Sequence, residues 1–309
     1  MSSKVAFLVP TYPPHFQFAK EFLKSFYSQK LDAQADVWFV FTNEEERIAF
    51  GGYKHSIVLS EELRVFENKG IINIKKFYGL RQIQDKYSYV IVLDSESRLL
   101  KNVNLFDICE EYFSSKILIG NEIFLGTKER TEGIKNSCRA FFVEHKDFEK
   151  LNNPLYLWFN QPCIYSCDTL DDFWNKIDYD KNIKNLKFDD FDYYIYMFYL
   201  ILYHEFQIDD IEIKSSYGIC ECPLKILEFK SKKYKKLSIL ITSSELLKKV
   251  NNPKCFLSVQ LDKSNNWKSA NPFSLKLANF IAKLLTFFIP NKTTRKSLRQ
   301  KIISKLTQK

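Results

Sequence analysis

The stretch Tyr-Ser-Tyr-Val-Ile-Val-Leu-Asp-Ser-Glu at positions 87–96 decides the fold of this chain. Its apolar run ends in Asp94, Ser95 and Glu96, which predicts a buried strand with carboxylates at its tip. Residues two apart in an extended segment share a face, so Asp94 and Glu96 can both reach one cation. Mg²⁺ or Mn²⁺ prefers such oxygen ligands. The alternative is that these residues cap a helix beginning near Ser97.

Other apolar runs share the chain with helical patterns. Strands are predicted at 5–9, 36–42 and 55–59, with helices at 16–27 and 70–87 between them. Alternation of strands and helices is typical of an α/β fold with a mostly parallel sheet flanked by helices. Further on, the sequence predicts strands at 116–120, 140–143 and 155–159 and helices at 168–177 and 191–204, and it leaves 224–262 ambiguous.

Polar residues follow the predicted strands in a recognisable layout. Pro10-Thr11-Tyr12 follows the first strand, and Arg81 stands thirteen residues before Asp94. This layout resembles GT-A-type (Rossmann-like) glycosyltransferases, and more narrowly the bacterial enzymes that build lipopolysaccharide, lipo-oligosaccharide or capsule. The resemblance covers roughly residues 4–110 and extends more loosely to about 205. Glu96 stands where the family's Asp-X-Asp motif has its second Asp.

The resemblance implies a metal-dependent hexosyltransferase and a set of binding residues. The donor would be a nucleotide-sugar, with a UDP-sugar expected, and Mn²⁺ or Mg²⁺ would bind Asp94 and Glu96. The nucleotide-sugar would be held by Pro10, Thr11, Tyr12, Asn43, Glu44, Arg81, Asp94 and Ser95. Taken singly, the loop residues among these have a structural alternative, and Arg81 could instead lie on a solvated helix face near Asp85. His15 is a further candidate near the nucleotide, with a solvated loop histidine as its alternative.

Two later segments are candidates for contacts with sugars and for proton transfer. Trp158, Asn160 and Gln161 follow an apolar run and would touch the donor sugar or the acceptor, unless they belong to a core and turn. Asp190 and Asp192 precede an aromatic helix, and either could take the acceptor's proton in an inverting transfer. Their alternative role is to stabilise the helix N-terminus. A retaining transfer would need no such base.

The net charge of +9 is concentrated at the carboxyl end. Residues 263–309 carry 11 Lys and Arg and no acid, which leaves residues 1–262 with 35 basic and 37 acidic residues. A nearly neutral body argues against a nucleic-acid partner. The tail combines an apolar helical stripe at 276–289 with basic residues interleaved with Leu and Ile after Pro290. This pattern favours a basic amphipathic helical tail on an anionic membrane surface, at 273–309, over a last helix packed on the core.

Composition also bears on compartment and domains. The seven cysteines show no paired C-x₂-C spacing, and the amino-terminal apolar run is too short for a signal-peptide core. We therefore expect free thiols and a cytoplasmic protein, peripheral on the inner face of the bacterial inner membrane. The expected domains are a GT-A-like catalytic domain at 1–262 (nucleotide-binding half 1–110, acceptor half 111–262) and a linker with the membrane-associating tail at 263–309.

Three functions follow from these features. The leading hypothesis is transfer of a sugar to a saccharide or lipid-linked saccharide in surface polysaccharide synthesis. A sugar-phosphate nucleotidyltransferase is the enzymatic rival, although its Gly-rich basic signature is missing after the first strand. The third is a non-catalytic protein that binds a membrane surface.

Removing residues 273–309 should abolish sedimentation with vesicles that contain anionic lipid. Each Lys or Arg near such a surface contributes about 1 kcal/mol of binding, and the tail holds no acid to offset its charge. Vesicles of neutral lipid serve as the control. If the shortened chain aggregates or unfolds instead, the apolar stripe covers core and the tail belongs to the fold.

Overall fold

The structure is a computed structural model that describes residues 5–64, 70–120, 128–154, 157, 163–210, 226–229, 237–240 and 258–260. It divides into two compact units, Met1–Cys222 with Thr242–Gln260, and Pro223–Ile241 with Leu261–Lys309. The predicted boundary after residue 262 stays a prediction. The predicted tail at 273–309 lies outside the described residues.

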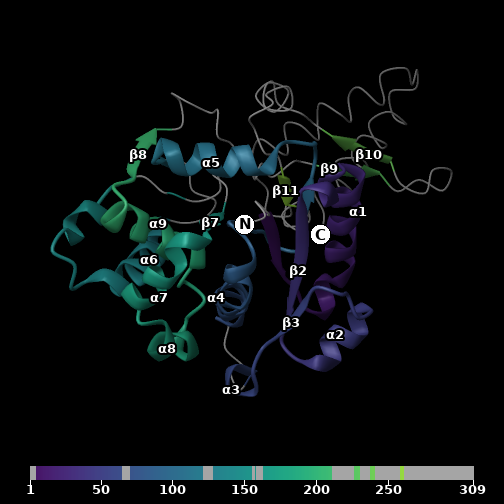
Figure 1. Ribbon diagram of the computed structural model, residues 1–309, viewed down its shortest axis with the longest axis horizontal. Coiled ribbons are helices and arrows are strands. Elements are labelled where there is room, and N and C mark those ends of the chain that lie inside the picture. Colours follow the sequence, from purple (N-terminus) through teal and green to yellow (C-terminus); the bar gives the residue numbers. More distant parts are fainter. Residues whose placement is uncertain are drawn as a thin grey trace, which may run out of the picture. The chain divides into compact units, whose positions relative to one another are not determined.

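The larger unit is built on a five-stranded sheet with the order β3-β2-β1-β4-β7. The strands are β1 (Val5–Pro10), β2 (Ala35–Phe41), β3 (Ser56–Val58), β4 (Tyr89–Val92) and β7 (Ile164–Ser166). The first four run parallel, and β7 pairs antiparallel with β4. The predicted class is confirmed: the fold is mixed α/β, with a mostly parallel central sheet flanked by helices (Figure 1).

Helices α1 (Phe16–Ser28) and α4 (Ile71–Ile83) cover β1 from opposite faces. Successive side chains of a strand point to opposite sides. Phe7 therefore packs edge-on against Phe22 and Phe26 of α1, at ring-centroid distances of 6.0 and 5.7 Å. Leu8 points the other way, to α4, where Gly79 leaves room for it. Both faces of β1 are covered, which explains its unbroken run of apolar residues.

The remaining helices lie to either side of this centre (Figure 1). Helix α2 (Glu44–Phe50) follows β2, and the helices after β6 gather on the other side, beside β7. The helices not yet given are α3 (Glu61–Arg64), α5 (Leu105–Ser115), α6 (Lys128–Arg139), α7 (Leu170–Lys176), α8 (Tyr179–Asn182) and α9 (Asp192–Tyr203). In α9 every residue from Asp192 to Leu202 is buried, because α4, α6 and α7 pack around it.

Three short strand pairs complete the described fold. Strand β5 (Ser97–Leu99) pairs antiparallel with β11 (Ser258–Gln260), and β6 (Ile117–Gly120) pairs parallel with β8 (Gln207–Asp210). In the smaller unit, β9 (Ile226–Phe229) pairs antiparallel with β10 (Leu237–Leu240). Among the described residues, no helix is both long and apolar enough to span a bilayer.

One local prediction and one alternative interpretation are wrong. The apolar run at 140–143 is not a strand, because Ala140–Phe142 forms a 3₁₀ turn that extends the end of α6. So short an apolar run cannot separate strand from helical turn by periodicity. Asp94, Ser95 and Glu96 do not cap a helix, because they form a turn that leads into strand β5. The strand predicted at 155–159 lies outside the described residues, apart from Leu157.

Replacing Gly79 with alanine should destabilise the fold. A Cβ there would lie 2.8 Å from Val40 Cγ2 and 3.0 Å from Leu8 Cδ1 and Cδ2, inside a packed layer. Overpacking of this kind costs about 1–3 kcal/mol, which exceeds the gain of about 1 kcal/mol in helix propensity. Gly133→Ala in α6 is the matched control, because its Cβ would meet nothing within 4 Å. Urea unfolding should show a loss for the first variant and none for the second; a Gly79→Ala protein at least as stable as the parent contradicts this packing.

Candidate functional site

The polar site lies where the order of the parallel strands reverses. From β1 the chain proceeds to β2 and β3 on one side, and β4 then pairs with the other side of β1. In such sheets the connections diverge at this point and leave a crevice beyond the carboxyl ends of the strands. Pro10 ends β1, and Asp94 follows β4 by two residues. The fold therefore brings the first and the fourth strand ends together.

A cavity of about 650 Å³ opens at this place. Its size falls in the range of small-molecule and cofactor sites. The lining comes from the ends of β1, β2 and β4, from α4 and from the start of α9: Pro10, Tyr12, His15, Thr42, Glu46, Ile71, Ile72, Asn73, Lys75, Lys76, Asp94, Ser95, Glu96, Phe188, Phe191 and Asp192. Seven of the candidate residues, His15 among them, thus share one cavity, although they are as much as 182 positions apart in the sequence.

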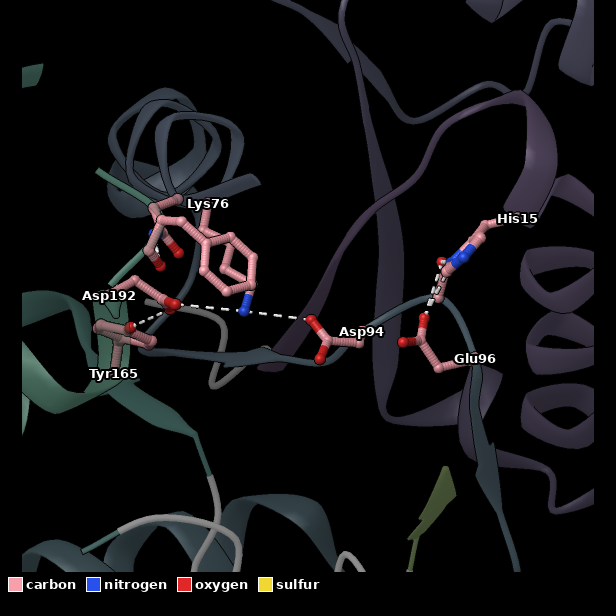
Figure 2. Close-up of polar contacts among 9 residues, drawn as sticks. His15, Lys76, Asp94, Glu96, Tyr165 and Asp192 are labelled. Carbon is pink, nitrogen blue, oxygen red and sulfur yellow. Dashed lines mark hydrogen bonds and ion pairs between the residues drawn. The ribbon is translucent and has the colours of Figure 1, made fainter. Parts of the chain in front are cut away.

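Three charged side chains and one tyrosine hydroxyl form a connected polar network at one end of the cavity. Lys76 Nζ lies 3.1 Å from Asp94 Oδ1 and 3.2 Å from Asp192 Oδ1, and the Tyr165 hydroxyl donates to Asp192 Oδ2 at 2.6 Å (Figure 2). Burial alone would lower the pKa of the Lys76 ammonium, but the charges of Asp192 and Asp94 outweigh it and hold that pKa above its ordinary value. Burial, reinforced by Asp192, also raises the pKa of Tyr165. Lysine and tyrosine both stay protonated at neutral pH and can donate.

Glu96 takes part in a separate polar group. Its Oε2 lies 3.2 Å from His15 Nδ1, which also lies 3.3 Å from Ser95 Oγ. The His15 ring packs against Tyr12, with centroids 4.2 Å apart and planes tilted by 31°. Both Ser95 and Glu96 contact the same ring nitrogen of His15, Nδ1. In a catalytic triad the histidine uses one ring nitrogen for the nucleophile and the other for the carboxylate, so these three residues are not arranged as a triad.

The predicted metal pair can be tested against this arrangement. Asp94 points to Lys76 and Glu96 points to His15, so the two carboxylates contact different partners (Figure 2). Within the described ranges, no group of three or more His, Cys, Asp or Glu is arranged to hold a metal ion. The cavity's charge still suits a divalent cation: four acids and two lysines line it, a formal balance of −2 with His15 neutral. Oxygen ligands and excess negative charge fit Mg²⁺ or Mn²⁺. Metal binding by Asp94 and Glu96 stays a prediction.

The opposite end of the cavity is organised by Glu46. Its carboxylate accepts hydrogen bonds from Thr42 N at 2.7 Å and Thr42 Oγ1 at 3.0 Å, and lies 3.4 Å from Lys75 Nζ. The Lys75 ammonium donates to the Thr11 carbonyl at 2.6 Å, and burial lowers the pKa of Lys75. Thr11, buried beside the cavity, therefore contributes its backbone. These bonds fix the ends of β1 and β2 to α4.

Several predicted residues do not line the cavity. Asn43 caps α2 by accepting from Glu46 N at 2.9 Å, and Glu44 forms an exposed ion pair with Arg47. Arg81 donates to Asp180 at 2.7 Å and lies over the ring of Tyr179. The contacts of these three with a nucleotide-sugar stay predictions. Trp158, Asn160 and Gln161 lie outside the described residues.

The two candidate bases differ in their surroundings. Asp190 accepts from Lys187 N at 2.6 Å and from the Ser137 hydroxyl, and it is not part of the cavity lining. It fastens the loop before α9 to α6, which is a structural role but a different one from the alternative given above, stabilisation of the helix N-terminus. Asp192 lines the cavity from the first turn of α9. Of the two, Asp192 is placed to face a ligand.

Sequence reasoning missed the two adjacent lysines of α4. Lys75 and Lys76 belong to a helix whose neighbours Ile74 and Phe77 are buried, so the pair interrupts an apolar pattern. A lysine is seldom buried unless it is paired. The signal was therefore present in the sequence, but their acidic partners lie far along the chain and only the fold identifies them.

A second cavity, of about 900 Å³, lies between the start of β6 and the end of α9, with Lys116, Lys150 and Glu205 among its lining. Lys116 pairs with Glu205 at 3.8 Å. This cavity is remote from the carboxyl ends of the parallel strands, and we do not assign it to the site.

Comparison with known proteins gives no family for this chain. No family model matches it, and no curated protein matches it. Among solved structures, 78 chains match. One of them, the crystal structure of S. aureus TarS, is 16% identical, with 55% of this chain and 29% of that chain covered and a TM-score of 0.31. This chain therefore spans less than a third of that structure's length, and so low a TM-score carries no weight for fold or for function.

Proposed function

We propose that this protein is a glycosyltransferase that moves a sugar from a nucleotide-sugar to a saccharide or lipid-linked saccharide acceptor. The observation that carries the proposal is the cavity at the strand reversal, where Asp94, Glu96 and Asp192 meet at the end of a parallel sheet. The GT-A resemblance of the sequence supports the same activity. Surface polysaccharide synthesis at the inner face of a bacterial membrane, reached through the basic tail, completes the proposal.

The cavity offers different chemistry at different places. At Tyr12 an exposed aromatic ring suits the flat face of a nucleobase, and at Glu46 a hydrogen-bonded carboxylate suits its polar edge. Near Asp94 and Glu96, the excess of negative charge would oppose a diphosphate unless a cation is added. Mn²⁺ or Mg²⁺ held by these two carboxylates would neutralise the diphosphate and stabilise it as a leaving group. A UDP-sugar is the donor we propose first.

Asp192 is the proposed base for an inverting transfer. The acceptor oxygen bonds to the anomeric carbon, the bond from that carbon to the diphosphate oxygen breaks, and the nucleoside diphosphate leaves with the electron pair. The acceptor's proton passes to Asp192. Tyr165 and Lys76 hold this carboxylate in place against rotation. A retaining transfer would not use this proton acceptor, so the stereochemistry of the product bears directly on its role.

Asp94→Ala should abolish transfer while the protein stays folded. The Asp94 side chain is 27% exposed, so its removal takes away a charged contact and little core volume. A panel of sugar nucleotides, screened first by thermal shift with and without Mn²⁺, would identify the donor, and its hydrolysis or transfer would be followed by release of nucleoside diphosphate. Asp180→Ala, which removes the surface partner of Arg81, is the control. Full activity of the Asp94→Ala protein in excess EDTA would contradict a metal site at Asp94.

Asp192→Asn should keep donor binding and lose turnover by about 10²–10⁴-fold, the usual contribution of a general base. Asp190→Asn is the matched control two residues away. It should keep turnover but lower the free energy of unfolding, by about 1 kcal/mol, because it weakens the bonds from Lys187 and Ser137. The measurements are donor affinity by calorimetry, steady-state kcat and urea unfolding. Equal turnover in the two variants would remove Asp192 from the chemistry.

A further inference from the structure

Lys76 is the unexpected member of the site. Its ammonium is the link between the strand end that carries Asp94 and the helix that carries Asp192, and its side chain is only 14% exposed (Figure 2). Asp94 Oδ1 is therefore already paired with a resident positive charge. A divalent cation that binds Asp94 must either displace this ammonium or stay close to it.

Electrostatics makes these two cations compete. Like charges a few ångströms apart repel each other, and they repel more strongly inside a protein than in bulk water. Lys76 thus disfavours a metal ion at Asp94 as long as nothing else accepts the ammonium. A diphosphate changes this balance, because it brings new oxygen acceptors beside the same lysine.

The surroundings of Lys76 allow such an exchange. An ammonium has three donors, of which Asp94 and Asp192 use two, so one remains for a phosphate oxygen. Asp192 is held by Tyr165 and keeps the lysine in the site when Asp94 is lost as a partner. A small cavity of about 20 Å³ lies beside the ammonium, with Lys76, Asp94 and Asp192 among its lining residues.

We propose that Lys76 is a resident counter-ion of this site. It neutralises Asp94 while the donor is away, and it exchanges Asp94 for the diphosphate when a divalent cation and the donor bind. Metal ion and nucleotide-sugar then bind as a coupled pair, and a free metal ion binds weakly. This inference rests on the proposed function, since it takes a nucleoside diphosphate as the ligand.

The test is the substitution Lys76→Met, which removes the charge and keeps much of the side-chain length. Binding of Mn²⁺ alone is measured from the electron paramagnetic resonance signal of the free ion, and binding of UDP in saturating Mn²⁺ is measured by calorimetry. We expect opposite changes: Mn²⁺ affinity rises on the order of tenfold, and UDP affinity falls on the order of tenfold. A merely structural role for Lys76 would weaken both.

Three further variants keep the result interpretable. Lys76→Arg retains the charge and should leave Mn²⁺ affinity low. Lys184→Met removes an exposed lysine that pairs with Glu62 and should change neither affinity. Because Lys76→Met leaves the buried Asp192 without its cation, the double variant Lys76→Met/Asp192→Asn, which removes both charges, should fold and still show the tighter Mn²⁺ binding.

The outcomes separate this inference from the proposed function. Unchanged Mn²⁺ affinity in Lys76→Met and in the double variant overturns the counter-ion role, even if the parent protein transfers sugar. A parent protein that binds no sugar nucleotide of the panel overturns the proposed function and removes the diphosphate exchange with it.

Discussion

The close packing of α4 on the parallel sheet is the constraint on which the site depends. Gly79 lets the helix approach Leu8 of β1 and Val40 of β2 without an intervening side chain. Three and four residues before Gly79, Lys76 is then held at the carboxyl end of β4, beside Asp94, and Lys75 at the carboxyl end of β1, beside Thr11. A wider spacing between helix and sheet would carry both ammonium groups away from Thr11 and Asp94. The geometry of the polar site thus depends on an apolar contact one helical turn away, at Gly79.

Much of this fold follows from the sequence alone. The strands at β1, β2 and β4 are predictable because each contains an apolar run that is largely buried, and Asp94 is conspicuous because it ends such a run. The antiparallel β7 and the turn at Ala140–Phe142 are not, because runs of three or four apolar residues carry no period. Local pattern therefore predicts the four parallel strands, including β3 at one edge of the sheet, but not the antiparallel β7 at the other edge.

The residues of the candidate site are likewise only partly predictable from the sequence. Pro10, Tyr12, Asp94, Ser95 and Glu96 could be selected because they follow predicted strands, and Asp192 because it begins an aromatic helix. The partners that orient them could not be selected, because the ion pair of Lys76 with Asp192 spans 116 positions of the chain. Asn43 and Asp190 also have structural uses that the sequence pattern alone does not separate from ligand binding: Asn43 caps α2, and Asp190 ties the loop before α9 to α6.

The tyrosines of helix α9 limit the rotation of this helix about its own axis. An all-leucine helix in the same place could turn by some degrees at little cost, since apolar packing has no preferred direction. Here tyrosine hydroxyls along one face of the helix bind partners on other elements: Tyr193 binds Tyr112, Tyr196 binds Thr169, and Tyr199 binds Asp172. Hydrogen bonds weaken steeply with angle, so each bond resists turning. These bonds hold the helix against rotation about its axis. Its first residue, Asp192, therefore presents its carboxylate oxygens in one fixed direction.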